Sequence, residues 1–255
     1  MGLPSLELNG KVAIVTGSTK GIGYGLACGL AQAGADVVIT SRHQDDCIRV
    51  ADEISKDYNV KTLALAVDVT KGEQVQSLVQ KTVEQFGHID VLVNNAGTAS
   101  SKPSEDLTER DWNYILEINQ KAVFFTAQAV GKQMIAQKSG KIINVASIFG
   151  LVGSKAILPY CVSKGGVLQM TKTLALEWAE YNIQVNALCP GYIITPMNED
   201  YVTNKSIHDQ IISKTPMKRF GEIEDMKGPI VFLASESSNY MTGQTLTVDG
   251  GWTSQ

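Results

Sequence analysis

Thr16-Gly17-Ser18-Thr19-Lys20-Gly21-Ile22-Gly23 joins a short apolar run to a stretch with helical character. Glycines at such a turn let the backbone approach a pyrophosphate closely, and the helix that follows presents unpaired N–H groups and the positive end of its dipole. A tight turn without a ligand would also use glycines, so this segment needs support from its neighbours. The whole stretch from Gly17 to Gly23 is therefore a candidate dinucleotide-binding turn.

Seven short runs rich in β-branched and other apolar residues alternate with longer amphipathic stretches on both sides of this turn. The runs lie at residues 11–16, 36–40, 61–67, 89–93, 140–146, 183–189 and 245–248. Each run is too continuously apolar for a strand with one solvent-exposed face, which predicts burial between two helical layers. Helical stretches follow every run but the last, and Thr70-Lys71-Gly72-Glu73 predicts a capping box for one of them.

This alternation predicts one α/β domain over residues 1–255, a doubly wound Rossmann-type fold with a seven-stranded parallel sheet and helices on both faces. The stretch 192–221 departs from the pattern, because it is polar, weakly periodic and contains Pro196 and Pro216. We expect it to be a mobile substrate-binding segment rather than a core element.

Composition excludes several classes of protein. Twenty-two basic and 26 acidic residues give a formal net charge of −4, which offers no broad attraction to nucleic acid or to anionic lipid. The apolar runs are far shorter than the roughly 18 residues of a membrane span. Four scattered cysteines without a C-x-x-C pair predict reduced thiols, and three dispersed histidines predict no metal site. We therefore expect a cytoplasmic enzyme that acts on a small molecule, with no nucleic-acid or membrane partner.

The end of the second apolar run reads Thr40-Ser41-Arg42-His43, about 20 residues beyond the glycines, where a dinucleotide site holds the adenosine ribose. An acidic residue there would accept hydrogen bonds from a free 2′-hydroxyl and repel a 2′-phosphate. A hydroxyl and a guanidinium, Ser41 and Arg42, do the reverse. The residues favour NADP(H) as the cofactor, and Lys20 adds a second cation.

A second candidate site is Tyr160-Cys161-Val162-Ser163-Lys164, with Ser147 at the end of an upstream strand. At i and i+4 on a helix, Tyr160 and Lys164 share one face. A fixed ammonium stabilises a phenolate, which brings the pKa of a tyrosine toward the range where it can exchange protons. Tyr160 is therefore the candidate acid and base.

With these motifs together, from about residue 8 to its end, the chain resembles the short-chain dehydrogenase/reductase family. The spacing G-x-x-x-G-x-G of the glycine turn is similar to that family's variant of the dinucleotide motif. Further matching segments occur in the same order, namely Asp68-Val69, Asn94-Asn95-Ala96-Gly97, Ile115-Leu116-Glu117-Ile118-Asn119 and Pro190-Gly191.

The resemblance implies roles for these residues. Asp68 would contact the adenine amino group, Asn95 would steady the adenosine side, and Thr195 would bind the nicotinamide carboxamide. Ser147 would hydrogen-bond the substrate oxygen, while Lys164 would hold the nicotinamide ribose and Asn119 would order a water in a proton relay. The remaining implied cofactor contacts are Val69, Ala96, Gly97, Pro190, Gly191 and Ile193.

The closing part of the chain, in His208–Pro216 and Glu224–Ser235, looks most like gluconate 5-dehydrogenases of this family, which interconvert gluconate and 5-ketogluconate. A sugar acid needs a cation in the site, and Lys155 is the nearest basic candidate, with Lys218 and Arg219 as alternatives. Lys155 could equally be a lysine at the rim of the site with no substrate contact.

Two other functions stay open. The catalytic positions are also those of 3-oxoacyl carrier-protein reductases, although docking an acidic carrier calls for cations and Glu177-Trp178-Ala179-Glu180-Tyr181-Asn182 has none. A non-catalytic dinucleotide-binding scaffold would be expected to lose Tyr160 or Lys164, and both are present. By resemblance, the helices that carry Asn119 and Tyr160 pack against partner copies, which implies a homotetramer.

Overall fold

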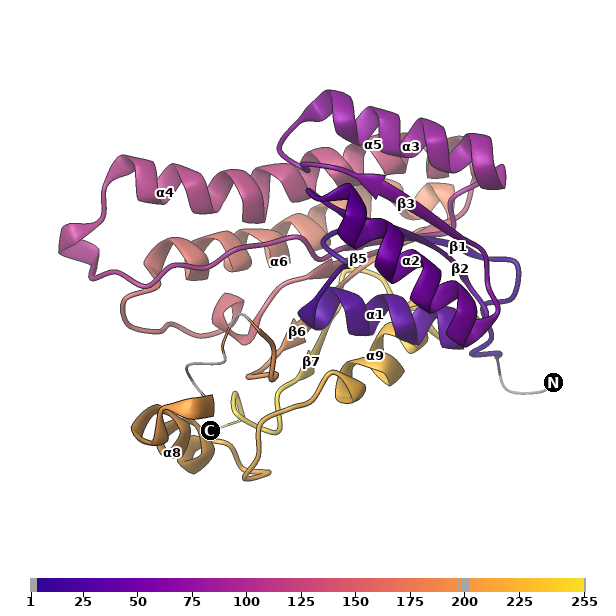
Figure 1. Cartoon of the computed structure of the whole chain (residues 1–255). Coiled ribbons are helices and arrows are strands. Elements are labelled where there is room, and N and C mark those ends of the chain that lie inside the picture. Colours follow the sequence, from indigo (N-terminus) through magenta and orange to yellow (C-terminus); the bar gives the residue numbers. More distant parts are fainter. Residues whose placement is uncertain (1–3, 197, 199–201, 255) are drawn as a thin grey trace.

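Seven parallel strands form one sheet in the order β3-β2-β1-β4-β5-β6-β7 in the computed structural model (Figure 1). The strands are β1 (Val12–Val15), β2 (Asp36–Ser41), β3 (Thr62–Ala66), β4 (Val91–Asn94), β5 (Gly140–Val145), β6 (Ile183–Pro190) and β7 (Thr245–Val248). The structure describes residues 4–196, 198 and 202–254. All seven predicted strands and their parallel pairing are confirmed.

Burial follows the position of each strand in the sheet. The central strands β1 and β4 are buried along their whole length, as their uninterrupted apolar runs predict. The edge strands β3 and β7 are mostly half-buried, because each has a neighbour on one side only. The expectation of full burial thus holds for these central strands and not for the two edges.

Helices cover both faces of the sheet (Figure 1). One face carries α1 (Gly21–Gln32), α2 (Gln44–Tyr58) and α9 (Glu224–Ala234), whose apolar residues share one core cluster. The other face carries α3 (Gly72–Phe86), α5 (Ala122–Gln137) and α6 (Leu158–Trp178), which contribute to a second cluster. The predicted two-layered arrangement around the sheet is confirmed.

Two further helices lie to the left of the sheet in Figure 1, α4 (Glu109–Leu116) and α8 (Lys205–Lys214). A π-helical turn, Glu117–Lys121, joins α4 to α5. Short 3-10 turns occur at Ser104–Asp106, Ile148–Gly150, Ala179–Tyr181 and Glu236–Ser238.

The capping box predicted at Thr70-Lys71-Gly72-Glu73 is wrong. Helix α3 begins at Gly72 after Lys71, which makes no side-chain cap. The Thr70 hydroxyl donates to Asp68 Oδ1 at 2.7 Å, and Lys71 rather than Thr70 occupies the N-cap position.

The segment 192–221 is more ordered in secondary structure than its composition predicts. Helix α8 lies within it, and the Asn204 side chain accepts hydrogen bonds from the N–H groups of Ser206 and Ile207 to cap that helix. Ile211 and Phe220 are buried. The prediction that the segment lacks core elements is wrong for these residues, while its mobility stays a prediction.

The sheet order reverses direction between β1 and β4, since β2 and β3 lie on one side of β1 and the later strands lie beyond β4. In doubly wound sheets, ligands bind beside the carboxyl ends of the strands at such a reversal. The glycine turn begins where β1 ends, so it lies at this point of the fold.

Candidate active site

A cavity of about 1230 Å³, the main cavity, opens at the carboxyl ends of the strands and collects segments that are far apart in the sequence. The predicted site residues on its wall are Gly17, Thr19, Lys20, Gly21, Ile22, Gly23, Ser41, Arg42, Asp68, Val69, Asn95, Ala96, Gly97, Ser147, Tyr160, Lys164, Pro190, Gly191 and Thr195. The structure therefore brings most of the candidate residues to one place.

The glycine turn is held in a shape that side chains would disturb. Gly17 and Gly21 have positive φ values of 64° and 58°. A Cβ on Gly23 would lie 2.3 Å from the carbonyl oxygen of Gly17 and equally close to Asn95 Nδ2. The turn thus packs directly against the start of its own helix.

Asn95 and Thr16 clamp this turn to the loop after β4. Asn95 Nδ2 donates to the carbonyl oxygens of Thr16 at 2.9 Å and Gly17 at 3.1 Å. In return, the Thr16 hydroxyl accepts from the N–H groups of Asn95 and Ala96 at 2.9 and 3.0 Å. Asn95 therefore holds the shape of the glycine turn through side-chain and main-chain bonds together.

Two predicted cofactor residues lie behind the wall of the main cavity. Ser18 is fully buried, and its hydroxyl accepts a hydrogen bond of 2.9 Å from the N–H of Thr40, which ties the turn to β2. Ile193 is packed into the core cluster below the sheet and forms an isolated bridge with Gly221. In this structure both side chains support the site from behind.

Ser41, Arg42 and Lys20 line the main cavity. Because Ser41 and Arg42 are predicted to hold the adenosine ribose, the wall around them is called the adenosine end. Ser41 Oγ donates to the carbonyl of His43 at 3.1 Å, so the chain turns sharply after β2. Burial would raise the pKa of Asp68, but hydrogen bonds from Thr70 and the charges of Lys71 and Arg42 lower it overall. Asp68 is therefore a carboxylate close to the Arg42 cation.

Ser147, Tyr160 and Lys164 also line the main cavity. Ser147 lies two residues after the end of β5, and its hydroxyl accepts a hydrogen bond of 3.2 Å from the N–H of Phe149. Lys164 is 5% exposed, donates to the carbonyl oxygen of Val145 at 2.7 Å and lies 5.7 Å from the centroid of the Tyr160 ring. Burial lowers the pKa of Lys164 to about 8. The expected one-face arrangement of tyrosine and lysine is present.

Asn119 is fully buried in the π-helical turn and lies beside the site rather than on the cavity wall. Its amide bonds the main chain of Thr98, a residue that does line the main cavity. A single π-helical turn of this kind is often found at functional sites.

The candidate cations for a substrate carboxylate are placed differently from one another. Lys155 is exposed and is not on the wall of the main cavity. Arg219 forms a bidentate ion pair with Asp225, at 2.6 and 2.9 Å, and the Lys218 ammonium donates to the carbonyl of Ser213 at 2.8 Å. Both alternatives to Lys155 are thus engaged within the fold.

The cavity wall also includes residues that the motifs did not single out. Asp46 and Arg49 lie on α2 at the adenosine end, and Arg110, Tyr114 and Ile118 lie along α4 and the turn that follows. The last three are spaced four residues apart, so a helical prediction for this stretch would have placed them on one face. The four-residue spacing was visible in the sequence, but no known motif identified these residues as part of a site.

Over the described residues, no three histidine, cysteine, aspartate or glutamate side chains are grouped so that they could hold a metal ion. Within the same part of the chain, no helix has the length and apolar character needed to cross a bilayer. The four cysteines are free thiols, and Cys28, Cys47 and Cys189 are buried.

Comparison with known proteins gives close matches over nearly the whole chain. The profile of the family described as enoyl-(acyl carrier protein) reductase matches residues 17–253. A 2-dehydro-3-deoxy-D-gluconate 5-dehydrogenase of Escherichia coli is 41% identical over 254 residues, 99% of each chain. A 3-oxoacyl-[acyl-carrier-protein] reductase of Thermotoga maritima is 39% identical over 249 residues, 96% of this chain and 99% of the relative.

Solved structures agree with these sequence matches. The crystal structure of a gluconate 5-dehydrogenase from Burkholderia cenocepacia, in complex with NADP and tartrate, has a TM-score of 0.94 and 38% identity to this chain, with 98% of both chains covered.

Proposed function

Because this chain belongs to the short-chain dehydrogenase/reductase family, we propose that it is an NADP(H)-dependent oxidoreductase that interconverts a carbonyl and a secondary alcohol on a sugar acid or polyol. Gluconate and 5-ketogluconate are the substrate pair we favour. One observation carries the proposal: the glycine turn and the group of Ser147, Tyr160 and Lys164 line the same cavity.

The residues of the glycine turn fit a dinucleotide. Helix α1 begins after Lys20 without a side-chain cap, so the amides of its first turn are available to a pyrophosphate. A Cβ at Gly17 would lie 3.1 Å from the Cα of Ala96, which shows how closely the backbone segments approach there. NADP(H), when bound, supplies or accepts the hydride.

Ser41, Arg42 and Lys20 support the choice of NADP(H) over NAD(H). These three residues line the same cavity. A 2′-phosphate would receive charge-assisted hydrogen bonds from their hydroxyl, guanidinium and ammonium groups. Positions 41 and 42 hold no acidic residue, which would be needed to bind the free ribose hydroxyls of NAD(H).

Tyr160 would act as the general acid in reduction and as the general base in oxidation. In the direction of reduction its hydroxyl delivers a proton to the substrate oxygen, and in oxidation the phenolate removes it. Ser147 would donate a hydrogen bond to the same oxygen, and the Lys164 ammonium would stabilise the phenolate and hold the cofactor ribose. With the hydride placed on carbon and the proton on oxygen, the carbonyl becomes a secondary alcohol.

Sugar-acid chemistry is supported by the resemblance to gluconate dehydrogenases and by the acidic end of α6. Glu177 lies at the end of α6 and Glu180 just after it, and this stretch has no basic residue to attract an acidic carrier protein. A 3-oxoacyl carrier-protein reductase remains the second candidate, because relatives of that description match almost as well. A non-catalytic scaffold is disfavoured by the presence of both Tyr160 and Lys164.

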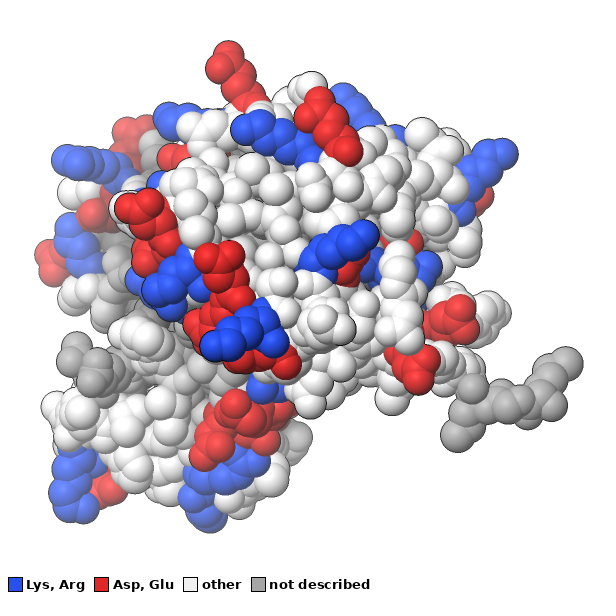
Figure 2. All heavy atoms as spheres, turned by 45° about the vertical axis from the view of Figure 1, so that its right-hand side comes forward, with Lys and Arg blue, Asp and Glu red and all other residues white. Residues whose placement is uncertain are grey.

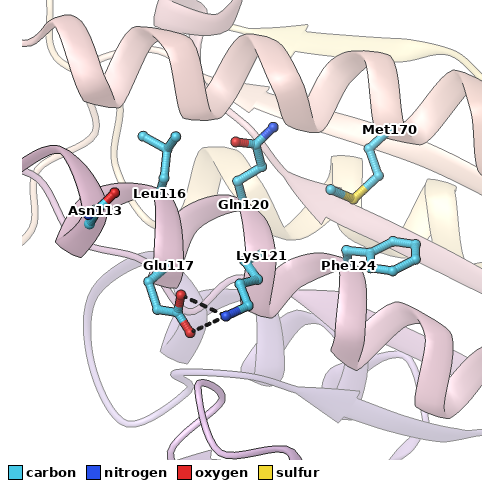
Figure 3. A pocket seen from close by; sticks show the side chains of 7 residues that line it. All are labelled: Asn113, Leu116, Glu117, Gln120, Lys121, Phe124 and Met170. Atoms are coloured by element: carbon cyan, nitrogen blue, oxygen red, sulfur yellow. Dashed lines mark hydrogen bonds and ion pairs between the residues drawn. The ribbon is translucent and has the colours of Figure 1, made fainter.

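We propose that the protein is a homotetramer assembled partly through α5 and α6. A groove of about 570 Å³ lies between these helices and the end of α4, lined by residues that include Gln120, Phe124 and Met170 (Figure 3). Nearby apolar side chains are exposed, with Phe125 at 45% and Leu176 at 83%. A helix with apolar residues on all sides is usually buried. Light scattering of Leu176→Glu would test the assembly, and an unchanged mass would contradict this interface.

A cytoplasmic location and a small-molecule partner complete the proposal. Free thiols suit a reducing compartment. On the face drawn in Figure 2, lysine and arginine alternate with aspartate and glutamate over the surface, without a broad field of one sign. Such a face offers nothing to concentrate a polyanion such as nucleic acid.

Substrate and cofactor are decided by one set of assays. Purified protein is given NADPH or NADH with 5-ketogluconate, an uncharged ketone of similar size, or an acetoacetyl thioester. We expect the highest kcat/KM for NADPH with the keto acid. A clear preference for the thioester would favour the acyl reductase, and absence of turnover with every ketone would favour the scaffold.

A further inference from the structure

An ion pair on α2 lines the adenosine end of the main cavity and has no role in the function proposed above. Asp46 and Arg49 share this wall with Ser41 and Arg42. They follow Arg42 by only four and seven residues, within the first turns of the helix that begins at Gln44. The cavity therefore has a third cation and a carboxylate close to the place where a 2′-phosphate would lie.

The Arg49 guanidinium is only loosely held by protein groups. It lies 3.8 Å from Asp46 Oδ1 and 3.6 Å from Glu53 Oε2, and its side chain is 61% exposed. Both distances exceed those of charge-assisted hydrogen bonds, which are about 2.7–2.9 Å. The N–H donors of Arg49 therefore remain available to an anion in the cavity.

Glu53 is itself fixed from the neighbouring helix. The Tyr24 hydroxyl on α1 donates a hydrogen bond to Glu53 Oε1. Tyr24 comes one residue after Gly23, so this bond connects the glycine turn to α2 through the carboxylate that faces Arg49. Helix α1 therefore holds the carboxylate group that lies 3.6 Å from Arg49.

The direction of helical side chains brings Arg49 toward the cofactor. Side chains on an α-helix tilt toward its N-terminus and cover the preceding turn. For Arg49 the preceding turn holds Asp46, and before it lies His43, which also lines the cavity. Arg49 therefore lines the same cavity as Ser41 and Arg42.

Because Asp46 lines the cavity, a 2′-phosphate can bind beside it only if a nearby cation offsets the negative charge of Asp46. A carboxylate on the cavity wall would repel a 2′-phosphate, and Arg49 is the cation that faces it. An uncharged residue at position 49 would leave Asp46 uncompensated in the site.

We propose that Arg49 is an additional determinant of cofactor choice, which donates to the 2′-phosphate of NADP(H) and neutralises Asp46 beside it. The inference rests on the proposed function. Tyr24 and Glu53 act as positioning residues for this guanidinium.

The test is the binding of NADPH and NADH to the full chain, measured by fluorescence titration. In Arg49→Gln the Kd for NADPH rises roughly five- to tenfold, as expected for a charge-assisted contact at an exposed site, while the Kd for NADH changes less than about twofold. Asp46→Asn tightens NADPH and leaves NADH unchanged. Arg49→Lys keeps the charge but loses the fork of donors, so its NADPH affinity lies between wild type and Arg49→Gln.

Lys56→Gln is the matched control, because it removes one positive charge from the same helix at a position away from the cavity wall. It should leave both affinities unchanged. The inference is overturned if Arg49→Gln binds NADPH like wild type, if it weakens NADPH and NADH equally, or if Lys56→Gln has the same effect. Tighter binding of NADH than NADPH by the wild-type protein would instead remove the proposed cofactor, and this inference with it.

Discussion

Asn119 and Thr98 exchange two hydrogen bonds of 2.8 Å, one from the Thr98 N–H to Asn119 Oδ1 and one from Asn119 Nδ2 to the Thr98 carbonyl. The amide is fully buried and reaches Ser163 Oγ at 3.4 Å as well. The Asn119 side chain therefore satisfies both main-chain hydrogen-bonding groups of Thr98, in the loop after β4. That loop carries part of the cavity wall, so Asn119 has a positioning task in addition to the water-ordering role that remains a prediction.

The first prediction follows from this pair. Asn119→Ala leaves the N–H and carbonyl of Thr98 without partners, so the free energy of unfolding should fall by about 2 kcal/mol. Turnover should fall too, because the loop shifts. Denaturant titration of Asn119→Ala and of Thr98→Ser checks this, since the serine variant keeps both main-chain bonds. Equal stability of the two variants would show that these bonds contribute nothing.

The second prediction concerns proton transfer. Tyr160→Phe keeps the ring and removes the hydroxyl, so kcat should fall by a factor on the order of 10² or more while NADPH still binds. Lys164→Met should lower both turnover and cofactor affinity, because it removes the ammonium that lies 5.7 Å from the Tyr160 ring centroid on the cavity wall. Steady-state rates and fluorescence titrations separate the two effects. Wild-type turnover in Tyr160→Phe would end the proposed mechanism.

The third prediction tests the shape of the glycine turn. In Gly23→Ala the new methyl group would meet the Gly17 carbonyl oxygen and Asn95 Nδ2 at 2.3 Å. The backbone must move, which costs about 1–3 kcal/mol of stability, and NADPH binding should weaken with it. Gly72→Ala is the control, since a Cβ there meets nothing within 4 Å. If thermal unfolding and NADPH titration give the same result for both variants, the close packing of the turn is irrelevant.

The fourth prediction concerns stability against pH. Lys141 is partly buried and donates to Ser238 Oγ at 3.0 Å, and burial lowers its pKa from 10.5 to about 8 in the folded protein. Between these values the unfolded chain holds a proton that the folded chain has released, so the free energy of unfolding rises with pH across this window. The rise should be smaller in Lys141→Met. Urea titrations from pH 7.5 to about 10.5 measure the two slopes, and parallel slopes would contradict the prediction.

The fifth prediction is the test of Lys155. If its ammonium binds the substrate carboxylate, Lys155→Met should raise KM for a keto acid and spare an uncharged ketone of similar size. Lys155 is exposed and lies off the cavity wall, so this contact requires movement of its loop when substrate binds. If KM for the keto acid is the same in the wild-type protein and in Lys155→Met, Lys155 is a lysine at the rim of the site with no substrate contact.

Much of the architecture was already encoded in local patterns. The continuous apolar runs predicted all seven strands, because a strand buried on both faces has no polar side to interrupt it. The glycine turn and the Tyr160-to-Lys164 spacing predicted which residues would line the cavity, because each motif spans fewer than ten residues and its geometry is set by one turn or one helix.

Other features depended on individual side-chain contacts that the sequence patterns do not specify. Thr70 bonds Asp68 instead of capping α3, and Arg219 is held by Asp225, so neither polar side chain does what its sequence neighbours suggested. Ile211 and Phe220 are buried in a segment whose composition predicted an irregular loop.

The sequence by itself determined the strand pattern, the parallel sheet and the main motifs, because these depend on residues that are close along the chain. Only the tertiary structure decided that Asn119 would hold Thr98 and that Arg49 would share a wall with Arg42 while Glu53 and Tyr24 connect it to the glycine turn. Such pairings arise where separate helices and loops pack together. Periodicity along the chain carries no information about which polar groups meet across that packing.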